Sequence, residues 1–496
     1  MGFNPNPPGA APEPAPATLD PADWQSLRLQ SHRMLDDVLD YVEHIRNRPV
    51  WRPMDQQIRA VFRAPVPQHP TDLSEVYRDF SNYILPFATG NVHPGFMGWV
   101  HGGGTIVGML AEMLAGGLNA NCGGRDHAPI EVERQIVAWA RRLFGFPEEA
   151  TGLFVTGTSL ANFVAVLVAR RAALGPAVRQ AGLGDAGPRL VGYASAAVHG
   201  CIPRAMDYAG LGSNALRLIP VDSHHRIDLG ALRRAIAADR TAGLTPFLLV
   251  GTAGTVDIGA IDDLASLADL AAAEQLWFHV DGALGALGVL SPEIAPRLSG
   301  MDRAHSLALD FHKWGQVPYD AGFVLVRDGA LHRDTFAAQA DYLQRQPRGL
   351  AAGASWPTDF GPDLSRGFRA LKTWFTLRVY GTEQLGAVIS RTCRVARHLQ
   401  ARIAAEPRLE LLAPVQLNIV CFRYRSPDPD ALNAAIVADL QESGVAAPST
   451  TRILGQLAIR AAIFNHRTAE RDVDKMLDAV LQLGDRRAPS HSRTAE

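Results

Sequence analysis

Two neighbouring stretches of the sequence, LWFHVDGALGA (276–286) and HSLALDFHKWG (305–315), decide the fold. Each begins as a short apolar run and then reaches side chains that can ionise, Asp281 in the first stretch and Lys313 in the second. Similar apolar runs alternate with helical segments from about residue 150 onward. Strands that alternate with helices form mainly parallel sheets covered on both faces. The sequence therefore predicts an α/β fold with a large, mainly parallel sheet.

Five further apolar runs continue this pattern and are expected to be strands of the same sheet. Ligands of such sheets sit beyond the carboxyl ends of the strands. The residues that follow each run are therefore the candidates for function. The five runs are GLFVTG (152–157), RLVGYAS (189–195), LRLIPV (216–221), PFLLVG (246–251) and GFVLVRD (322–328).

The rest of the chain divides into smaller units. Apolar residues recur every three or four positions over residues 21–86, which predicts helices, and two more helices are expected over 105–118 and 130–144. Residues 344–358 are rich in Gly, Ala and Pro, so they form either a lid or a disordered insertion. The predicted units are a disordered arm (1–20), a helical segment (21–105), a large domain (106–379), a small α+β domain (380–486) and a disordered tail (487–496).

Composition excludes several classes of protein. The 496 residues carry a formal net charge of -2 and no run of Lys or Arg, so neither a nucleic acid nor an anionic membrane is an expected partner. No apolar stretch is long enough to span a bilayer, and the N-terminus lacks the pattern of a signal peptide. The four cysteines lie far apart without a CxxC pair. A cytoplasmic protein without disulfides is expected.

Lysine is scarce in this chain. Only Lys313, Lys372 and Lys475 occur among 48 basic residues. Arginine keeps its proton and cannot form an imine, so a retained lysine can mark chemistry that arginine cannot perform. Compositional drift explains Lys372 and Lys475 equally well. Lys313 differs because it follows an apolar run beside His312, where a lysine can hold a carbonyl cofactor as an imine. A solvated surface lysine is the plain alternative.

Asp281 supplies a possible partner for such a cofactor. A carboxylate at the end of an apolar strand is costly unless it meets a cation. A protonated pyridine nitrogen is such a cation, and the pairing keeps the ring able to accept electrons. A helix cap or a metal ligand would be the alternative. No cluster of His or Cys supports a metal, and none is expected.

Two further motifs follow apolar runs. In GLFVTGTSLAN, Thr158 and Ser159 would lie at a helix N-terminus, where hydroxyl and N–H groups bind phosphate. Simple N-capping would also explain them. In YASAAVHG, His199 could stack on a flat ring and contact a carboxylate, or it could be structural. Because all these motifs follow strands, they should converge at one edge of the sheet.

This set of motifs resembles the group II decarboxylases that depend on pyridoxal 5'-phosphate (PLP), the family of aromatic-L-amino-acid, histidine and glutamate decarboxylases. The resemblance runs from about residue 21 to about residue 483. Its most specific part is HVDGA followed about thirty residues later by HKW. The matching motifs are HPGF (93–96), GTSLAN (157–162), His199, GTAGTVDIGAIDDL (251–264), HVDGA (279–283), HKW (312–314) and FRALKTWF (368–375).

The resemblance implies a fold-type I PLP-dependent transferase fold and a homodimer with active sites at the subunit interface. The N-terminal helices would wrap the partner subunit. Lys313 would be the Schiff-base lysine, Asp281 would pair with the pyridine nitrogen, and His199 and Ala283 would cover the two faces of the ring. Thr158, Ser159 and His312 would hold the phosphate with Asp310 nearby, and Trp99, His101, Gly102 and Trp356 would line the substrate pocket.

The sequence departs from the family pattern at the loop. The family usually has a tyrosine there, which returns a proton to the substrate carbon after CO2 leaves. Residues 344–358 contain no tyrosine, and Trp356 stands near the expected place. An indole cannot donate a proton comparably. Tyr342 is a doubtful substitute. Residue 310 is also an acid where asparagine is common, which puts its phosphate contact in doubt.

The leading hypothesis is decarboxylation of an L-amino acid to its amine and CO2. The missing tyrosine raises a second one, in which O2 intercepts the reaction and yields an aldehyde. Other PLP chemistry in a biosynthetic pathway, or a non-catalytic binding protein, remains open. Trp99 favours an aromatic or histidine-like substrate, and the absence of an evident basic cluster makes glutamate a weaker candidate. Trp99 could equally belong to the core.

Overall fold

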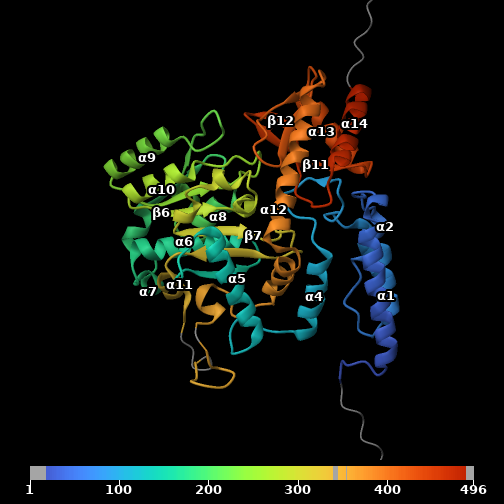
Figure 1. Cartoon of the computed structure of the whole chain (residues 1–496), viewed down its shortest axis with the longest axis horizontal. Helices are drawn as coiled ribbons and strands as arrows, with labels where there is room; N and C mark the ends of the chain where they lie inside the picture. The colour runs from blue at the N-terminus through green and yellow to red at the C-terminus, as the bar shows by residue number, and fades with distance from the viewer. Residues whose placement is uncertain (1–17, 339–343, 354, 488–496) are drawn as a thin grey trace, which may run out of the picture.

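The computed structural model describes residues 18–338, 344–353 and 355–487. The chain forms a large unit around a seven-stranded sheet, a smaller unit around a five-stranded sheet, and a group of N-terminal helices at one edge (Figure 1). The predicted disordered arm and tail fall largely outside the described residues. None of the helices in the described ranges is long and apolar enough to cross a membrane.

The large sheet has the strand order β2-β8-β7-β6-β5-β3-β4. All seven predicted strands are present, so this part of the prediction is confirmed. Only β8 runs against the others, because residues 311–321 are too few for a helical crossover from β7. The strands are β2 (Thr151–Val155), β3 (Leu190–Ser195), β4 (Leu216–Ile219), β5 (Thr245–Thr252), β6 (Trp277–Asp281), β7 (Ser306–Asp310) and β8 (Gly322–Val326).

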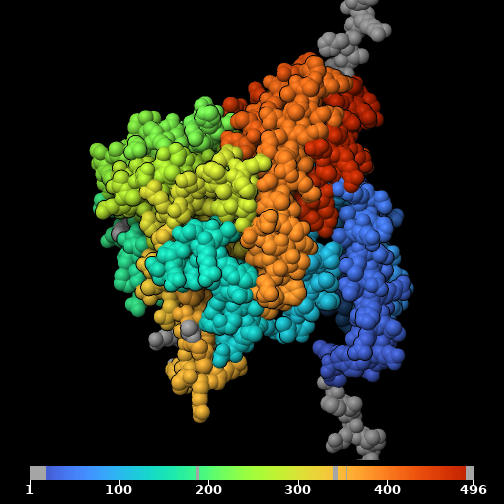
Figure 2. Space-filling model, viewed as in Figure 1, coloured from blue at the N-terminus to red at the C-terminus, as the bar shows by residue number. Residues whose placement is uncertain are grey.

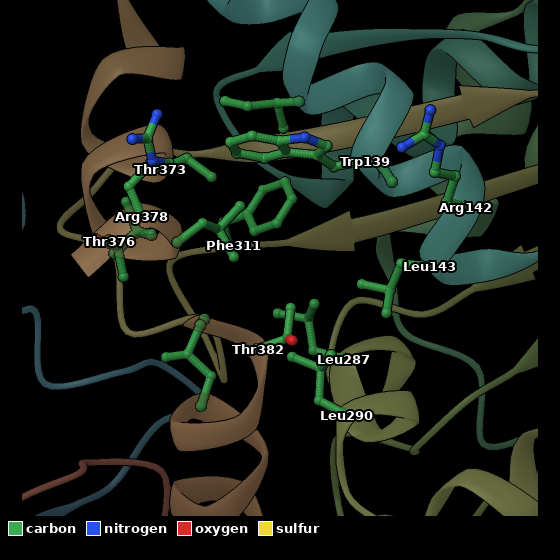
Figure 3. A pocket seen from close by; sticks show the side chains of 16 residues that line it. Trp139, Arg142, Leu143, Leu287, Leu290, Phe311, Thr373, Thr376, Arg378 and Thr382 are labelled. Atoms are coloured by element: carbon green, nitrogen blue, oxygen red, sulfur yellow. The ribbon is translucent and has the colours of Figure 1, made fainter. Parts of the chain in front are cut away.

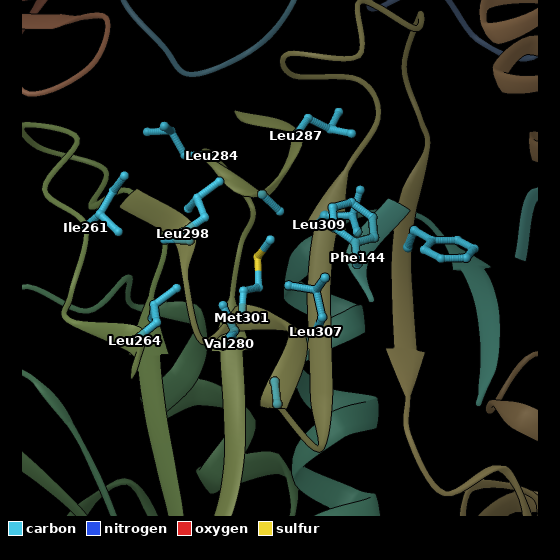
Figure 4. Close-up of a cluster of buried hydrophobic side chains, with 14 of the residues drawn as sticks. Phe144, Ile261, Leu264, Val280, Leu284, Leu287, Leu298, Met301, Leu307 and Leu309 are labelled. Atoms are coloured by element: carbon cyan, nitrogen blue, oxygen red, sulfur yellow. The ribbon is translucent and has the colours of Figure 1, made fainter. Parts of the chain in front are cut away.

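Helices cover both faces of this sheet, as the apolar runs predict. On one face α6 packs against side chains such as Val155 and Ala308, and α8 belongs to a second cluster with Ala194 and Val250. On the other face α5, α9 and α10 cover Val280, Leu307 and their neighbours (Figure 4). The helices of this unit are α4 (Ile106–Leu118), α5 (Ala128–Phe144), α6 (Thr158–Leu174), α7 (Val178–Ala181), α8 (Cys201–Tyr208), α9 (Leu229–Thr241), α10 (Leu264–Ala273) and α11 (Gly329–Phe336).

The two helices predicted before the sheet are confirmed within two residues. Helix α4 begins after Thr105, whose hydroxyl accepts the Gly108 N–H as an N-cap. Helix α5 begins at Ala128, and the chain leaves it through Gly145 in a left-handed conformation. These ends follow the local capping chemistry rather than the hydrophobic period alone.

The smaller unit has the strand order β1-β11-β12-β10-β9. Its core includes Met97 from β1, a strand that precedes all strands of the large sheet in the sequence. Its strands are β1 (Phe96–Met97), β9 (Leu409–Leu411), β10 (Ile419–Tyr424), β11 (Ala447–Ile453) and β12 (Gln456–Ala462), covered by α13 (Pro429–Glu442) and α14 (Glu470–Arg487).

A long helix, α12 (Arg369–Ala404), connects the two units. It breaks at Gly381, whose φ of 67° lies in the region that favours glycine. The predicted boundary at residue 379 falls beside this break. The division into domains stays a prediction, because a single helix spans the boundary.

The N-terminal helices are α1 (Trp24–Glu43), α2 (Gln56–Val61) and α3 (Leu73–Asp79). None of them contains a buried residue. They lie along one edge of the molecule, and the segment around residue 350 projects from the bottom of the view (Figure 2).

Candidate active site

A cavity of about 500 Å³ lies at the carboxyl ends of the parallel strands. Its walls come mainly from the turns that follow these strands, where the sequence predicted a ligand site. The cavity brings together nine residues that are far apart in the sequence. They are Thr158, Ser159, His199, Thr252, Asp281, Ala283, Asp310, His312 and Lys313, with Trp99, Tyr319 and Arg460 also in the wall.

Asp281 ends β6 and is buried in the wall of the cavity. One of its carboxylate oxygens accepts the Ala283 N–H at 3.1 Å. Among the described residues no cation forms an ion pair with it. Burial raises the pKa of Asp281, and the positive charge of Lys313 offsets part of this rise. A buried carboxylate that forms no ion pair with a described residue suits a ligand that carries a positive charge.

Lys313 lies on the turn after β7 and reaches the same cavity. Its Nζ is 2.8 Å from Oδ2 of Asp310. The other oxygen of Asp310 accepts the Thr158 N–H at 2.8 Å, at the start of α6. Asp310 therefore connects the lysine to the N-terminus of α6. Burial raises the pKa of Asp310, but Lys313, His312 and the hydrogen bonds bring it below the ordinary value.

The neighbouring His312 is buried and held in one orientation. Its Nδ1 accepts the Ala321 N–H at 3.0 Å, so the proton of the neutral ring lies on Nε2. Burial lowers the pKa of His312 to about 4, which keeps the ring neutral at pH 7. Nε2 lies 3.7 Å from Asp310 Oδ2. The ring thus presents an N–H donor beside the start of α6.

Two buried hydroxyl groups in the cavity wall have no hydrogen-bond partner among the described residues. They belong to Thr158, at the first turn of α6, and to Thr252, at the end of β5. Burying a hydroxyl group without a partner costs about 1–3 kcal/mol. Together with the helix N-terminus and the His312 N–H, the Thr158 hydroxyl suits an anionic oxygen ligand such as a phosphate. The donor set therefore fits the phosphate end of PLP.

His199 follows β3 and is exposed at the cavity. Its Nδ1 accepts the Cys201 N–H at 3.2 Å, which leaves the Nε2 proton available to a ligand. Ala283, two residues beyond Asp281, also lines the cavity.

A chain of hydrogen bonds supports the wall behind His199. His279 contacts the Ser306 hydroxyl at 2.9 Å through Nδ1 and Asn162 Oδ1 at 2.8 Å through Nε2. The Asn162 amide then donates to the Cys201 thiol at 3.1 Å. Burial raises the pKa of Cys201 to about 12, so the thiol stays protonated. The histidine of the HVDGA motif thus holds α6 and α8 in place instead of facing the cavity.

The predicted substrate-pocket residues lie in three different environments. Trp99 is 58% exposed and lines the cavity. His101 is buried, with its ring stacked on Phe96 and Tyr319 edge-on to it. Gly102 packs against the backbone of the lysine turn, because a Cβ there would lie 2.4 Å from the Lys313 carbonyl oxygen. Contact of the last two with a substrate stays a prediction.

Trp356 lies away from these residues within the subunit. It is 2% exposed, and the guanidinium groups of Arg125 and Arg345 lie over its ring. It lines a separate polar cavity together with Arg171 and Asp359. Tyr342, the other candidate from this loop, lies outside the described residues. The roles of both stay predictions.

Two residues of the cavity were missed by the sequence reasoning. Tyr319 lies in the turn after Lys313, with its ring 4.3 Å from that of His312. Arg460 comes from the smaller sheet, where it interrupts the apolar run LAIRAAIF. It is buried and donates to the carbonyl oxygens of Gly98 and Val256 at 2.9 and 2.6 Å. The sequence signal that could have identified Arg460 is a single arginine within an otherwise apolar strand.

Known proteins share these features. The family profile described as the pyridoxal-dependent decarboxylase conserved domain matches residues 55–425. The aromatic-L-amino-acid decarboxylase of Bacillus atrophaeus is 31% identical over 486 residues, which cover 95% of this chain and 98% of that protein. The phenylacetaldehyde synthase of Arabidopsis thaliana is 28% identical over 473 residues, with coverage of 92% and 95%.

The fold is also found among solved structures. The crystal structure of Oryza sativa TDC with PLP and tryptamine has a TM-score of 0.87 and 23% identity to this chain. The superposition covers 95% of this chain and 99% of that one. The two chains thus share the fold over nearly their whole length.

Proposed function

Since the chain belongs to the family of pyridoxal-dependent decarboxylases and is therefore a PLP-dependent carboxy-lyase, we propose that it converts an aromatic or histidine-like L-amino acid into its amine and CO2. The observation that carries the proposal is the pairing of two ionisable groups in one cavity. Both line it: the buried carboxylate of Asp281, which forms no ion pair with any described residue, and the amine of Lys313.

The residues of the cavity would hold the cofactor in one orientation. Lys313 would bind its aldehyde carbon, and Asp281 would pair with its ring nitrogen. The start of α6 with Thr158, Ser159 and His312 would hold the phosphate, and His199 and Ala283 would lie on opposite sides of the ring. Bound PLP supplies a carbonyl that condenses with amines and a cationic ring that accepts the electrons of the bond that breaks.

The side chains then have distinct tasks. Asp281 keeps the ring nitrogen protonated, because two opposite charges in a buried place stabilise each other. Asp310, whose Oδ2 lies 2.8 Å from Lys313 Nζ, would hold the lysine ammonium whenever it is not bound to the cofactor. The Nε2–H of His199 would donate a hydrogen bond to the substrate carboxylate and so orient the bond to be broken.

An aromatic wall supports the proposed class of substrate. Trp99 and Tyr319 are 58% and 54% exposed, and both line the cavity. Large aromatic side chains that remain exposed inside a cavity can pack against a flat ligand. The name of the Bacillus relative, an aromatic-L-amino-acid decarboxylase, points to the same class.

The experiment that tests this proposal is turnover of the PLP-loaded protein on a panel of L-amino acids. Tryptophan, tyrosine, phenylalanine, histidine, glutamate and 2,4-diaminobutyrate are incubated separately, and CO2 and amine are measured. We expect stoichiometric CO2 and amine from at least one aromatic amino acid or histidine. Release of CO2 from glutamate or 2,4-diaminobutyrate alone would contradict the proposed substrate class.

A second candidate reaction is oxygen-dependent conversion of the amino acid to an aldehyde. The absence of a tyrosine from residues 344–358 favours it, and one relative is a phenylacetaldehyde synthase. This reaction consumes O2 and releases CO2, ammonia and peroxide. Oxygen consumption during turnover separates the two reactions. An enzyme that forms amine at the same rate without O2 is a decarboxylase only.

We also propose that the protein is a cytoplasmic homodimer. The N-terminal helices bury no residue in the subunit, and Trp24 and Leu29 of α1 are 61% and 66% exposed. Such an apolar surface favours contact with a second copy. All four cysteines are buried and unpaired, which suits a reducing compartment. Light scattering of the full chain and of a variant lacking residues 1–50 tests the dimer.

A further inference from the structure

A second cavity, of about 520 Å³, lies on the other side of the lysine turn from the active site. It is enclosed by α5, α12 and the 3-10 turn over Ala286–Leu290 (Figure 3). Its wall is largely apolar. The residues that form this part of the wall include Ile136, Trp139, Leu143, Leu287, Leu290 and Leu385.

This cavity shares a wall with the segment that carries Lys313. Phe311, Gly315 and Val317 all line it. The side chain of Phe311 points into the space below Trp139 in Figure 3. A molecule bound here would therefore contact the turn that positions Lys313 without entering the active site.

One polar group inside the cavity has no partner. The Thr373 hydroxyl is fully buried and lacks a hydrogen bond to any described residue. Its side chain lines the cavity from α12, and Thr376 lies one turn further along. A buried hydroxyl without a partner suits a ligand with a polar atom at this end.

Two guanidinium groups line the cavity on opposite sides of Trp139 (Figure 3). Arg142 on α5 and Arg378 on α12 are both exposed and line the cavity. Arg378 lies over the ring of Trp374, and neither arginine forms an ion pair within the described ranges. Elsewhere in this chain arginines commonly pair with acids, as Arg397 does with Glu293. Each of the two is thus free to bind an anion.

The break in α12 forms part of the cavity wall. The helix restarts after Gly381, and Thr382 and Leu385 of the new segment line the cavity. The carbonyl end of the first segment and the N–H end of the second meet at this break, so their helix dipoles offset each other there. A guanidinium group that forms no ion pair with a described residue, at the edge of an apolar space, favours an amphipathic anion.

We propose that this cavity binds an apolar carboxylate, a hydrocarbon or aryl chain that ends in a carboxyl group. The apolar part lies between Trp139, Phe311 and Leu287, and the carboxylate lies near Arg378, on the side of the cavity that Thr373 lines. This site is separate from the PLP cavity, and the inference does not depend on which amino acid is the substrate.

The test uses sodium decanoate below its micelle concentration, titrated into the PLP-loaded full chain by calorimetry. 1-Decanol, which has the same chain without the charge, is titrated in parallel. We expect one decanoate per chain and weaker binding of decanol. In the double variant Arg142→Ala/Arg378→Ala, decanoate should bind about tenfold more weakly, because charge-assisted contacts are lost, and decanol should bind as before.

Matched variants separate this site from general effects of charge. Arg233→Ala/Arg234→Ala removes two exposed arginines from α9 and should leave decanoate binding unchanged. Thr373→Val keeps the shape of the side chain and should weaken decanoate binding several-fold. Absence of saturable binding, including the case in which a second copy of the chain covers the cavity, would overturn the proposal. Equal losses of decanoate binding in both double variants would also overturn it. So would a loss of decanoate binding in Arg460→Met alone, because Arg460 lines the active-site cavity and decanoate would then bind there.

Discussion

The carboxylate of Asp310 lies between the ammonium of Lys313 and the N-terminus of α6, with 2.8 Å to Lys313 Nζ on one side and 2.8 Å to Thr158 N on the other. This buried acid thus occupies a place where a phosphate would find its donors. Two anions near each other repel strongly in a buried site. Asp310 therefore has two opposite effects, since it holds the lysine in place and disfavours a phosphate.

Replacing Asp310 by asparagine should separate these effects. The Asn oxygen can still accept the Thr158 N–H, but the negative charge is gone. We expect Asp310→Asn apoprotein to bind PLP about tenfold more tightly, in line with roughly 1.4 kcal/mol of relieved repulsion. Pyridoxal, which lacks the phosphate, should change much less. Fluorescence titration of the apoprotein measures both. Weaker PLP binding would mean that holding Lys313 is the more important role.

Lys313 is predicted to be the residue that binds the cofactor covalently. In Lys313→Ala, the visible absorbance of the PLP-loaded protein and the release of CO2 should both be lost, the latter by at least a thousandfold, as for other covalent catalytic residues. Lys475→Ala is the matched control, because Lys475 is exposed on α14. A visible band that persists in Lys313→Ala after dialysis would show that another group binds the aldehyde.

The charge on Asp281 should make the apoprotein sensitive to pH. Burial raises the pKa of Asp281 above its unfolded value of about 3.9. An acid with a raised folded pKa stabilises the fold below its unfolded pKa, and this contribution is lost as pH rises through the folded pKa. Asp281→Asn apoprotein should therefore be more stable than the unchanged apoprotein at pH 8, by about 1–3 kcal/mol.

Urea denaturation at pH 4.5 and pH 8 measures this difference. The difference between Asp281→Asn and the unchanged apoprotein should be small at pH 4.5 and should grow toward pH 8. Asp207→Asn serves as a control, because Asp207 is exposed on α8. In the PLP-loaded protein the order should reverse, because the carboxylate then has its cationic partner. A pH-independent difference would show that Asp281 is not the group responsible.

Gly102 should be intolerant of any side chain. A Cβ would lie 2.4 Å from the Lys313 carbonyl oxygen and 3.1 Å from Gln316 Cα, so the lysine turn would have to shift. We expect Gly102→Ala to lose PLP at least tenfold more readily on dialysis, because displacement of a site by about 1 Å has large effects. Gly116→Ala is the control, since an added Cβ there would have no described atom within 4 Å apart from its chain neighbours and its own helix backbone. Equal PLP retention in both would contradict the close packing.

The sequence was sufficient for the large sheet and for the position of the cavity. Each strand is a compact apolar run, and the parallel arrangement brings the residues after these runs to one edge. Thr158, Asp281 and Lys313 therefore line one cavity. Only local chain length decided that β8 runs antiparallel.

The remaining features depend on contacts between distant segments. Arg460 reaches the cavity because β12 packs its side chain against Val256 and Gly98. The second cavity is lined from both sides of the break at Gly381, by Thr376 and by Leu385. His279 lies in the most specific motif, HVDGA, yet its ring contacts Asn162 and Ser306 behind the cavity wall. Hydrophobic periodicity contains none of this information.

Arg460 should be important for the stability of the whole protein. Its guanidinium group is buried and donates to Gly98, Val256 and Ser449, which belong to three separate segments. In Arg460→Met these oxygens lose their donor, so we expect a loss of about 2–4 kcal/mol in the free energy of unfolding. Arg452→Met, at an exposed position of the neighbouring strand β11, should cost less than about 1 kcal/mol, because exposed ion pairs contribute little. Urea denaturation of the PLP-loaded variants measures both losses.

Arg460 also lines the active-site cavity. The KM of the Arg460→Met variant for the substrate should therefore rise, while the KM of Arg452→Met stays unchanged. A loss of stability in Arg460→Met no larger than that in Arg452→Met would show that the three segments are held together by other contacts.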